Sequence, residues 1–490
     1  MTKPFAKDMS HHLSAESKSR KELNLKNAFK YFNQPGMTFL GGGLPLSDYF
    51  PFEKITADVP LAPFPNGCGA RVTEQDKTVV EVHKRKADND PAAKDVELAR
   101  SLQYGYTEGH TELVDFLKEH TDRIHRVPYE DWDVVTNVGN TQAWDACLRN
   151  FTTKGDVILV EDHTFSSAIE AAYAQGVTTF PITMDTEGIV PEALEQLMDN
   201  WVGAKPRMLY TICTGQNPTG SCLSAERRRA VYAVAQKHDL LIVEDEPYYF
   251  LQMEPYTKDV EARASRHVHG HDDFVRAMVP SFLSMDVDGR VLRLDSVLKT
   301  IAPGARLGWV VGQKKLLERF VRLHELTIQN TSGFTQSLLN GLFQRWGQGG
   351  YLDWLIGIRG EYTHKRDVAI DALYKYFPQE VVTILPPVAG MFFVVHLDAS
   401  KHPRFAELGS DPVAVETSIY EAALEHGCLM IPGSWFKAEG QTTPPQPSVS
   451  TDELLKNSIF FRGTYAAVPL DQLVIGLEKF GKAVKAEYNL

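Results

Sequence analysis

Short apolar runs alternate with longer amphipathic segments between about residue 100 and residue 330. Continuous aliphatic runs separated by helical segments are typical of parallel strands that are buried on both faces. Ser224 precedes one amphipathic segment, 225–238, and predicts a helix N-cap there. The pattern therefore predicts an α/β fold whose largely parallel sheet is covered by helices on both faces, with strands at 155–161, 207–213, 240–245, 291–296 and 306–312.

This rhythm changes in the second half of the chain. The stretch 255–290 is polar and rich in histidine, and long helical patterns begin at about residue 335. Further strands are expected at 391–397 and 459–465, and an exposed loop rich in proline and threonine at 440–451. We therefore expect a smaller α+β domain built from the C-terminal part and the N-terminal segment, with limits at 1–95 (N-terminal segment), 96–355 (large domain) and 356–490 (small domain).

Charge and composition argue against several classes of protein. The net charge is -12 and the pI is about 5.8, whereas a nucleic-acid-binding face must be basic. No apolar run approaches the ~20 residues of a membrane span, and the first residues lack the apolar stretch of a secretory leader. The 5 cysteines form no CxxC pair, which is typical of reduced thiols. We expect a cytoplasmic protein without a nucleic-acid or membrane partner.

Polar side chains gather where the predicted strands end. In open α/β sheets, ligands bind outside the carboxyl ends of the strands. An amide, an acid, a phenol, a hydroxyl, a lysine and an arginine would face one crevice there, namely Asn217, Asp245, Tyr248, Ser296, Lys299 and Arg306. Such a set suits a phosphorylated aromatic cofactor with a pyridine nitrogen.

Each of these residue types has a chemical reason to be present. A carboxylate such as Asp245 raises the pKa of a neighbouring pyridine nitrogen and keeps it protonated, so that the ring accepts electrons. Asn217 and Tyr248 can donate hydrogen bonds to a phenolate oxygen on the ring. Lys299 becomes nucleophilic, and a base, when it is desolvated or lies near other cations.

Several segments resemble one family of enzymes. The segments 217–220 (NPTG), 244–250 (EDEPYYF) and 295–309 (DSVLKTIAPGARLGW) resemble the signatures of fold-type I aminotransferases, which use pyridoxal 5′-phosphate. FLGGGLPL, LQYGYTEGHTEL, AGMFF and FFRGTYA are similar to segments of fungal aromatic aminotransferases and of the kynurenine/α-aminoadipate group. The resemblance covers about residues 20 to 485. It implies a seven-stranded sheet and a homodimer.

The resemblance also implies roles at the catalytic end of the site. Lys299 would bind the cofactor covalently and move the substrate α-proton. Asp245 would face the pyridine nitrogen, while Asn217 and Tyr248 would contact the phenolate oxygen, and Asn217 would also border the substrate. Arg462, in FFRGTY, would bind the substrate α-carboxylate.

Five further residues match positions in the family's pattern. Asn140 and Thr141 match the phosphate-binding turn before a helix, where free N–H groups favour anions. Phe165 matches the aromatic side chain that stacks on the cofactor ring. Tyr104 matches a residue that reaches the phosphate from the partner subunit, and Gly43 lies in the segment that closes over the substrate.

The phosphate end departs from this pattern. Ser296 and the fork of Arg306 can hold a phosphate. The family usually has a second hydroxyl just before the lysine, whereas Val297 and Leu298 precede Lys299 here. One phosphate contact is therefore missing or is supplied elsewhere.

The resemblance implies a two-step, ping-pong transamination of phenylalanine, tyrosine and tryptophan with 2-oxoglutarate or an aromatic 2-oxo acid. Aminoadipate and kynurenine stay open as substrates, because Lys26 can pair with a distal carboxylate. A lyase or synthase with the same cofactor also stays open. A regulator fused to a DNA-binding module is disfavoured, since only about 40 residues precede GGGLP. The histidines and aspartates of 267–273 are expected in a solvated, extended loop that holds no metal.

Overall fold

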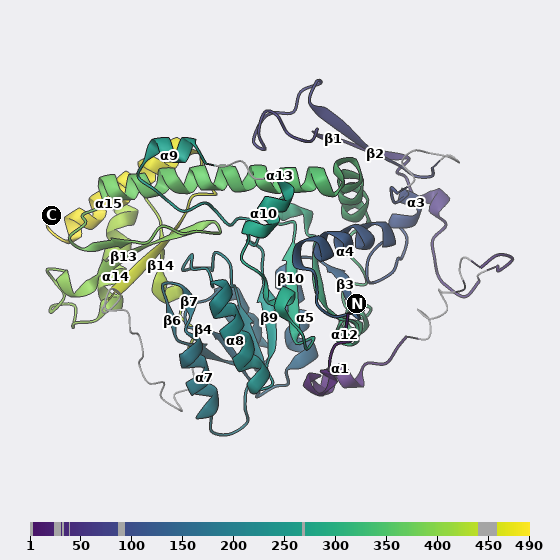
Figure 1. Cartoon of the computed structure of the whole chain (residues 1–490), viewed down its shortest axis with the longest axis horizontal. Coiled ribbons are helices and arrows are strands. Elements are labelled where there is room, and N and C mark those ends of the chain that lie inside the picture. The colour runs from purple at the N-terminus through teal and green to yellow at the C-terminus, as the bar shows by residue number, and fades with distance from the viewer. Residues whose placement is uncertain are drawn as a thin grey trace. The chain divides into compact units, whose positions relative to one another are not determined.

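The structure is a computed structural model that describes residues 3–23, 31, 34–38, 40–86, 94–266, 270–439 and 458–490. The chain forms two compact units. Figure 1 shows it coloured from purple at the N-terminus to yellow at the C-terminus. The first unit contains residues 1–154 and 280–354, and the second contains residues 155–279 and 355–490. The domain limits expected from the sequence stay a prediction. No helix in the described ranges has the length and apolar character needed to cross a membrane.

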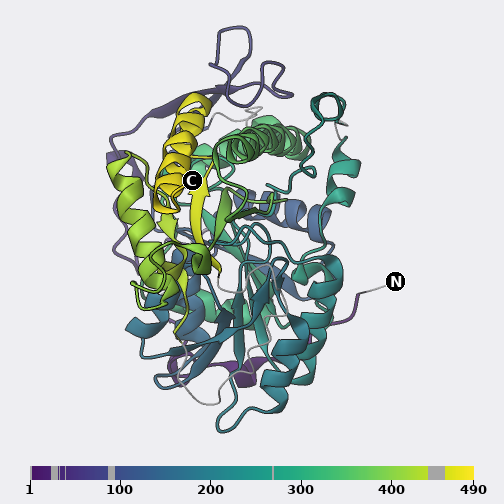
Figure 2. The same cartoon turned by 90° about the vertical axis from the view of Figure 1, so that its left-hand side faces the viewer.

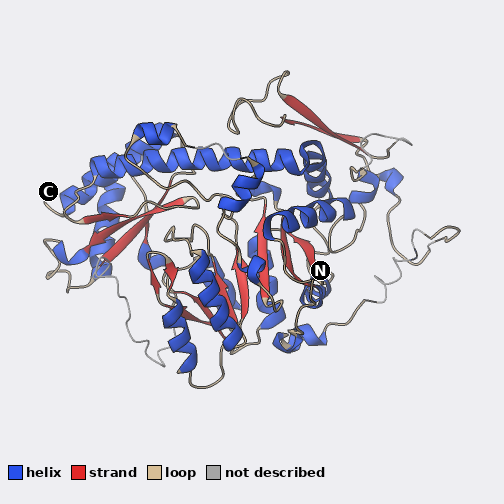
Figure 3. Ribbon diagram, in the orientation of Figure 1, coloured by secondary structure: helices blue, strands red, loops and turns tan. Residues whose placement is uncertain are grey.

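One seven-stranded sheet carries the strands that the apolar runs predict, drawn as red arrows in Figure 3. β4 is parallel to β5 and to β8, and β8 is parallel to β9, whereas β11 runs antiparallel to β10 and to β3. The α/β fold with a mostly parallel seven-stranded sheet is thereby confirmed. The strand order is β3 (Trp132–Asn137), β11 (Gly308–Gln313), β10 (Val291–Ser296), β9 (Leu241–Asp245), β8 (Met208–Thr211), β4 (Val157–Glu161) and β5 (Thr178–Ile182).

The first unit holds three of these strands and the helices that pack on them. Helix α5 (Asn140–Phe151) follows β3 directly and packs against β10 and β11, and α12 (Lys314–His324) packs against α5 and β3. Leu316, Phe320 and Leu323 on α12 are buried, as the 3.6-residue period requires. The unit also contains α1 (Ala15–Ser19), β1 (Lys54–Pro60), β2 (Lys77–His83), α3 (Leu98–Ser101), α4 (Thr111–His125) and α11 (Phe282–Met285). Helix α13 (Gly333–Tyr376), which begins here, is interrupted at Gly347.

The second unit holds the other four strands of the sheet. Helix α8 (Ala225–Lys237) begins after Ser224, whose side chain accepts a hydrogen bond from the Arg227 backbone N–H. The predicted N-cap is confirmed, because this contact satisfies one of the donors left free at a helix start. The unit also contains α6 (Ser166–Ala174), β6 (Met184–Asp185), β7 (Gly188–Ile189) and α7 (Pro191–Asp199).

A second, antiparallel sheet lies in the C-terminal part of the second unit. Its order is β12 (Val382–Ile384), β13 (Phe392–Asp398), β15 (Ser458–Thr464) and β14 (Ile431–Pro432). Helices α14 (Pro412–Glu425) and α15 (Leu470–Glu487) lie beside this sheet and share one apolar core with it (Figure 2). The strands predicted at 391–397 and 459–465 are confirmed, whereas the loop predicted at 440–451 lies outside the described residues.

The polar stretch after β9 is more regular than the sequence suggests. It contains α9 (Val260–Ala264) and α10 (His271–Ala277), so the extended loop expected at 267–273 is wrong for its described end. The physical reason is that Asp272 and Asp273 lie in the first turn of α10, where negative charge favours a helix. Arg263 of α9 also forms a two-point ion pair with Asp371 of α13, at 2.6 and 2.7 Å. Residues 267–269 are outside the described part.

Candidate active site

In the first unit, the expected phosphate-binding residues lie at the start of α5. Asn140 and Thr141 are its first two residues, and the N-cap residue before them, Gly139, has no side chain that could cap this end. Gly139 has a φ of 109° there, and a Cβ at this position would lie 2.7 Å from Nη2 of Arg306. Arg306 donates a hydrogen bond of 2.6 Å to the carbonyl of Val138. An uncapped helix N-terminus beside an arginine attracts an anion.

Ser296 and Lys299 follow at the end of β10. Ser296 Oγ is buried and has no hydrogen-bond partner within the described ranges, which is costly unless a ligand supplies one. The Lys299 amine likewise forms no ion pair with any residue that the structure describes, and burial lowers its pKa. The Leu298 side chain lies 3.3 Å from the position of a Cβ on Gly139, so an apolar group stands where the family usually has a hydroxyl. The two free groups suit a ligand, and the lowered pKa of Lys299 favours a nucleophilic amine.

The second unit holds the expected acid, amide and phenol. Asp245 ends β9, and Tyr248 and Asn217 lie on the turns that follow β9 and β8, where all three are buried. The hydroxyl of Tyr210 donates a hydrogen bond of 2.7 Å to Asp245 Oδ2. Burial, followed by the charge of Asp245, raises the pKa of Tyr248, while Arg462 lowers it. The charges of Asp245 and Arg462 therefore both act on the hydroxyl of Tyr248.

Arg462, in the same unit, is held by one hydrogen bond and by contacts with two aromatic rings. Its Nη1 donates to Asn217 Oδ1 at 2.6 Å. Its guanidinium lies between the rings of Phe392 and Phe436, 4.5 Å from each ring centroid. Burial lowers the pKa of Arg462, and no carboxylate pairs with it in the part of the chain that the structure describes. A desolvated cation without a counter-ion suits an anionic ligand, which a guanidinium binds with two parallel hydrogen bonds.

Three further expected residues lie at partly buried or exposed positions. Phe165 is partly buried at the N-cap position of α6 in the second unit. Tyr104 and Gly43 belong to the first unit and are exposed, Tyr104 to 58%. Their expected roles need a bound cofactor, a partner subunit or a closing segment, and these roles stay predictions.

Several residues near the expected ones were not singled out from the sequence. Tyr210 contacts Asp245, and Phe392 and Phe436 enclose Arg462. Glu161 ends β4 as Asp245 ends β9, so a carboxylate at the end of an apolar run was a signal that could have found it. The signal for Tyr210 was weaker, because it is a single tyrosine within a predicted buried strand.

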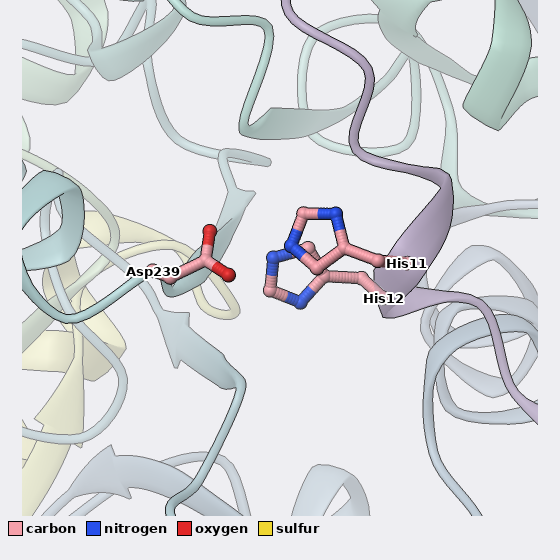
Figure 4. A group of neighbouring side chains, drawn as sticks. All are labelled: His11, His12 and Asp239. Atoms are coloured by element: carbon pink, nitrogen blue, oxygen red, sulfur yellow. The ribbon is translucent and has the colours of Figure 1, made fainter.

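Two other groups of side chains have the composition of metal ligands. Glu244 and Glu246 are buried with Cys213, but Nη1 of Arg228 lies 3.3 Å from Glu244 and 3.2 Å from Glu246. Arg228 therefore supplies the positive charge beside these two carboxylates, in the place that a metal ion would take. His11 and His12 of the first unit have ring centroids 4.2 Å apart, and Figure 4 draws them with Asp239, which belongs to the second unit. Neither group adds a residue to the candidate site.

Comparison with known proteins identifies the family. A family model of class I and II aminotransferases matches residues 72–456. An aromatic amino acid aminotransferase of Schizosaccharomyces pombe is 40% identical over 99% of both chains, and an L-tyrosine:2-oxoglutarate aminotransferase of Serpula lacrymans is 32% identical over 98% of this chain and 96% of its own. The crystal structure of the aminotransferase Aro8 from Candida albicans matches all of both chains with a TM-score of 0.95 and 64% identity. The chain belongs to the class I and II aminotransferase family, and it is an aminotransferase.

Proposed function

We propose that this aminotransferase transfers the amino group of phenylalanine, tyrosine or tryptophan to 2-oxoglutarate or to an aromatic 2-oxo acid, in two half-reactions. The relatives support this proposal, since they include aromatic amino acid aminotransferases and an L-tyrosine:2-oxoglutarate aminotransferase. The alternative substrates, aminoadipate and kynurenine, fit these names less well. Lys26, on which the alternative depended, is outside the described residues.

The proposed cofactor is pyridoxal 5′-phosphate, and the residues present fit it. At the phosphate end, Ser296 has an unpartnered buried hydroxyl, and the uncapped start of α5 at Asn140 and Thr141 lies beside Arg306. The ring would be held by Asp245 at the pyridine nitrogen, by Asn217 and Tyr248 at the phenolate oxygen, and by stacking on Phe165. When bound, the cofactor supplies an electron sink for negative charge at the substrate α-carbon.

The chain's own residues would then bind the substrate and move its proton. Arg462 binds the α-carboxylate with the edge of its guanidinium that Asn217 does not occupy. The Lys299 amine, whose pKa is lowered by burial, takes the proton from the α-carbon and returns it later in the cycle. Gly43 lies in the segment that we expect to close over the substrate. The observation that carries the proposal is the half-buried guanidinium of Arg462, which pairs with no carboxylate in the described ranges.

We also propose a homodimer and a cytoplasmic location. The 58% exposure of Tyr104 leaves its side chain available to a partner subunit, where it would reach the phosphate. The 5 cysteines, all of which the structure describes, form no disulfide with one another, as is typical of the reducing cytoplasm.

Replacement of Lys299 tests the proposed attachment of the cofactor. Lys299→Ala should abolish turnover and leave no cofactor that borohydride can fix to the chain, as mass spectrometry would show. Lys315→Ala removes an exposed lysine of the same unit that pairs with Asp8. Borohydride should fix the cofactor to this variant as it does to the unchanged protein. Fixation of the cofactor in Lys299→Ala would overturn the assignment.

A further inference from the structure

Tyr210 and Asp245 lie on neighbouring strands and on the same face. Tyr210 is paired with Val243 in the parallel register of β8 and β9. Asp245 follows Val243 by two residues, and side chains two apart on a strand point to the same side of the sheet. The next residue on β8, Thr211, donates instead to Glu161 on β4. Tyr210 is thereby directed toward Asp245.

The contact between them is a buried hydrogen bond. Tyr210 is 0% exposed and Asp245 is 6% exposed, and the two oxygens are 2.7 Å apart. A hydrogen bond to an ionised carboxylate is short and about twice as strong as one between neutral groups. Burial, followed by the charge of Asp245, raises the pKa of Tyr210 well above its usual range, so the hydroxyl stays a donor at working pH.

Using the proposed function, we infer that Tyr210 is a positioning residue for the cofactor-binding acid. Its hydroxyl holds Oδ2 of Asp245, so that the carboxylate keeps its charge and one orientation toward the ring nitrogen of the cofactor. Tyr210 itself would touch neither the substrate nor the reacting atoms. It acts only through Asp245, by fixing the group on which the electron-accepting state of the ring depends.

Tyr210→Phe tests this role, since it removes one hydroxyl and keeps the shape of the ring. The dissociation constant of pyridoxal 5′-phosphate from the apoprotein, measured by quenching of tryptophan fluorescence, should rise about tenfold, as expected for one hydrogen bond to a charged group. The pH at which the absorption of the bound cofactor changes should also shift, because the charge beside the ring nitrogen is no longer fixed.

Tyr249→Phe is the matched control. Tyr249 is also buried, and its hydroxyl donates to the carbonyl of Val279 at 2.9 Å rather than to Asp245. The free energy of unfolding should fall in this variant by about as much as in Tyr210→Phe. Its affinity for the cofactor and the absorption of the bound cofactor should stay those of the unchanged protein. A role for Tyr210 in stability alone would make the two variants behave alike, and that result would overturn the inference.

A double-mutant cycle separates action through Asp245 from any other effect. In an Asp245→Asn background, the further change Tyr210→Phe should leave the dissociation constant of the cofactor unchanged. Additive losses would overturn the inference, as would an unchanged affinity and absorption in Tyr210→Phe alone. Failure of the proposed function is distinguishable, because the unchanged protein itself would then show no cofactor bound at Lys299.

Discussion

At the scale of single residues, Arg228 and Arg462 differ in how their positive charge is compensated within the described part of the chain. Arg228 is fully buried, but it is paired with Glu244 and Glu246 and donates to Thr214 at 2.7 Å. Arg462 is half-buried against two aromatic rings, and its Nη1 donates to the amide oxygen of Asn217. Because a desolvated charge without a counter-ion is costly, Arg462 is the arginine whose charge the carboxylate of a substrate would compensate.

Arg462→Lys tests this distinction. Lysine keeps the charge but loses the planar fork, the contact with Asn217 and the position between the rings. We expect kcat/KM for an aromatic donor to fall about 100-fold, the value of two hydrogen bonds to a charged group, with the cofactor still bound. Arg404→Lys, at an exposed arginine that pairs with Glu487, should leave kcat/KM unchanged. A normal kcat/KM in Arg462→Lys would remove the carboxylate-binding role.

At the scale of elements, the ends of the buried strands carry the polar groups. Glu161 at the end of β4 accepts hydrogen bonds from four groups, which lie on the segment after β4 and on β8 and the turn after it: Thr164, Thr211, Ile212 and Gln216. Gln216 directly precedes Asn217. One buried carboxylate therefore joins the segment that leads to Phe165 with the turn that carries Asn217.

This arrangement has a consequence for stability that depends on pH. Burial raises the pKa of Glu161 from its ordinary value of 4.5 to about 7, against the effect of its hydrogen bonds. The folded chain binds this proton more tightly than the unfolded chain, so its contribution to stability is complete below about pH 4.5 and is lost as pH rises through about 7. Glu161→Gln should therefore reduce the fall in the free energy of unfolding between about pH 5 and about pH 8, measured with urea.

The control for Glu161 is Glu170→Gln on α6, where the carboxylate is exposed. This variant should keep the pH dependence of the unchanged protein. If Glu161→Gln also keeps it, the raised pKa of Glu161 is contradicted.

The sequence predicted the long buried elements well and the short polar ones poorly. A buried strand reads as a continuous apolar run, so β4, β9 and β10 lie within two residues of their predicted limits. The helices α9 and α10 have 5 and 7 residues, too few for a helical period to stand out in a polar stretch. They depend instead on first-turn acids and on ion pairs with α13, such as the contact between Arg263 and Asp371.

At the scale of the whole molecule, strand order explains what the sequence could not show about the site. The positions of Asp245 and Lys299 at strand ends were predictable from the chain alone. The partnership of Tyr210 with Asp245 was not, because it depends on β8 and β9 being neighbours and on their register. The position of Arg462 between Phe392 and Phe436 likewise depends on the pairing of β13 with β15 and of β14 with β15.

Transamination of aromatic amino acids is tested most directly by a panel of donors with 2-oxoglutarate as acceptor. The panel contains phenylalanine, tyrosine, tryptophan, 2-aminoadipate and kynurenine, and both glutamate and the oxo acid of each donor are measured. We predict that phenylalanine, tyrosine and tryptophan each yield glutamate and the matching oxo acid in equal amounts, with higher kcat/KM than 2-aminoadipate or kynurenine. Formation of glutamate from none of the donors would contradict transamination and favour a lyase or synthase, and a higher kcat/KM for 2-aminoadipate or kynurenine would contradict the proposed specificity.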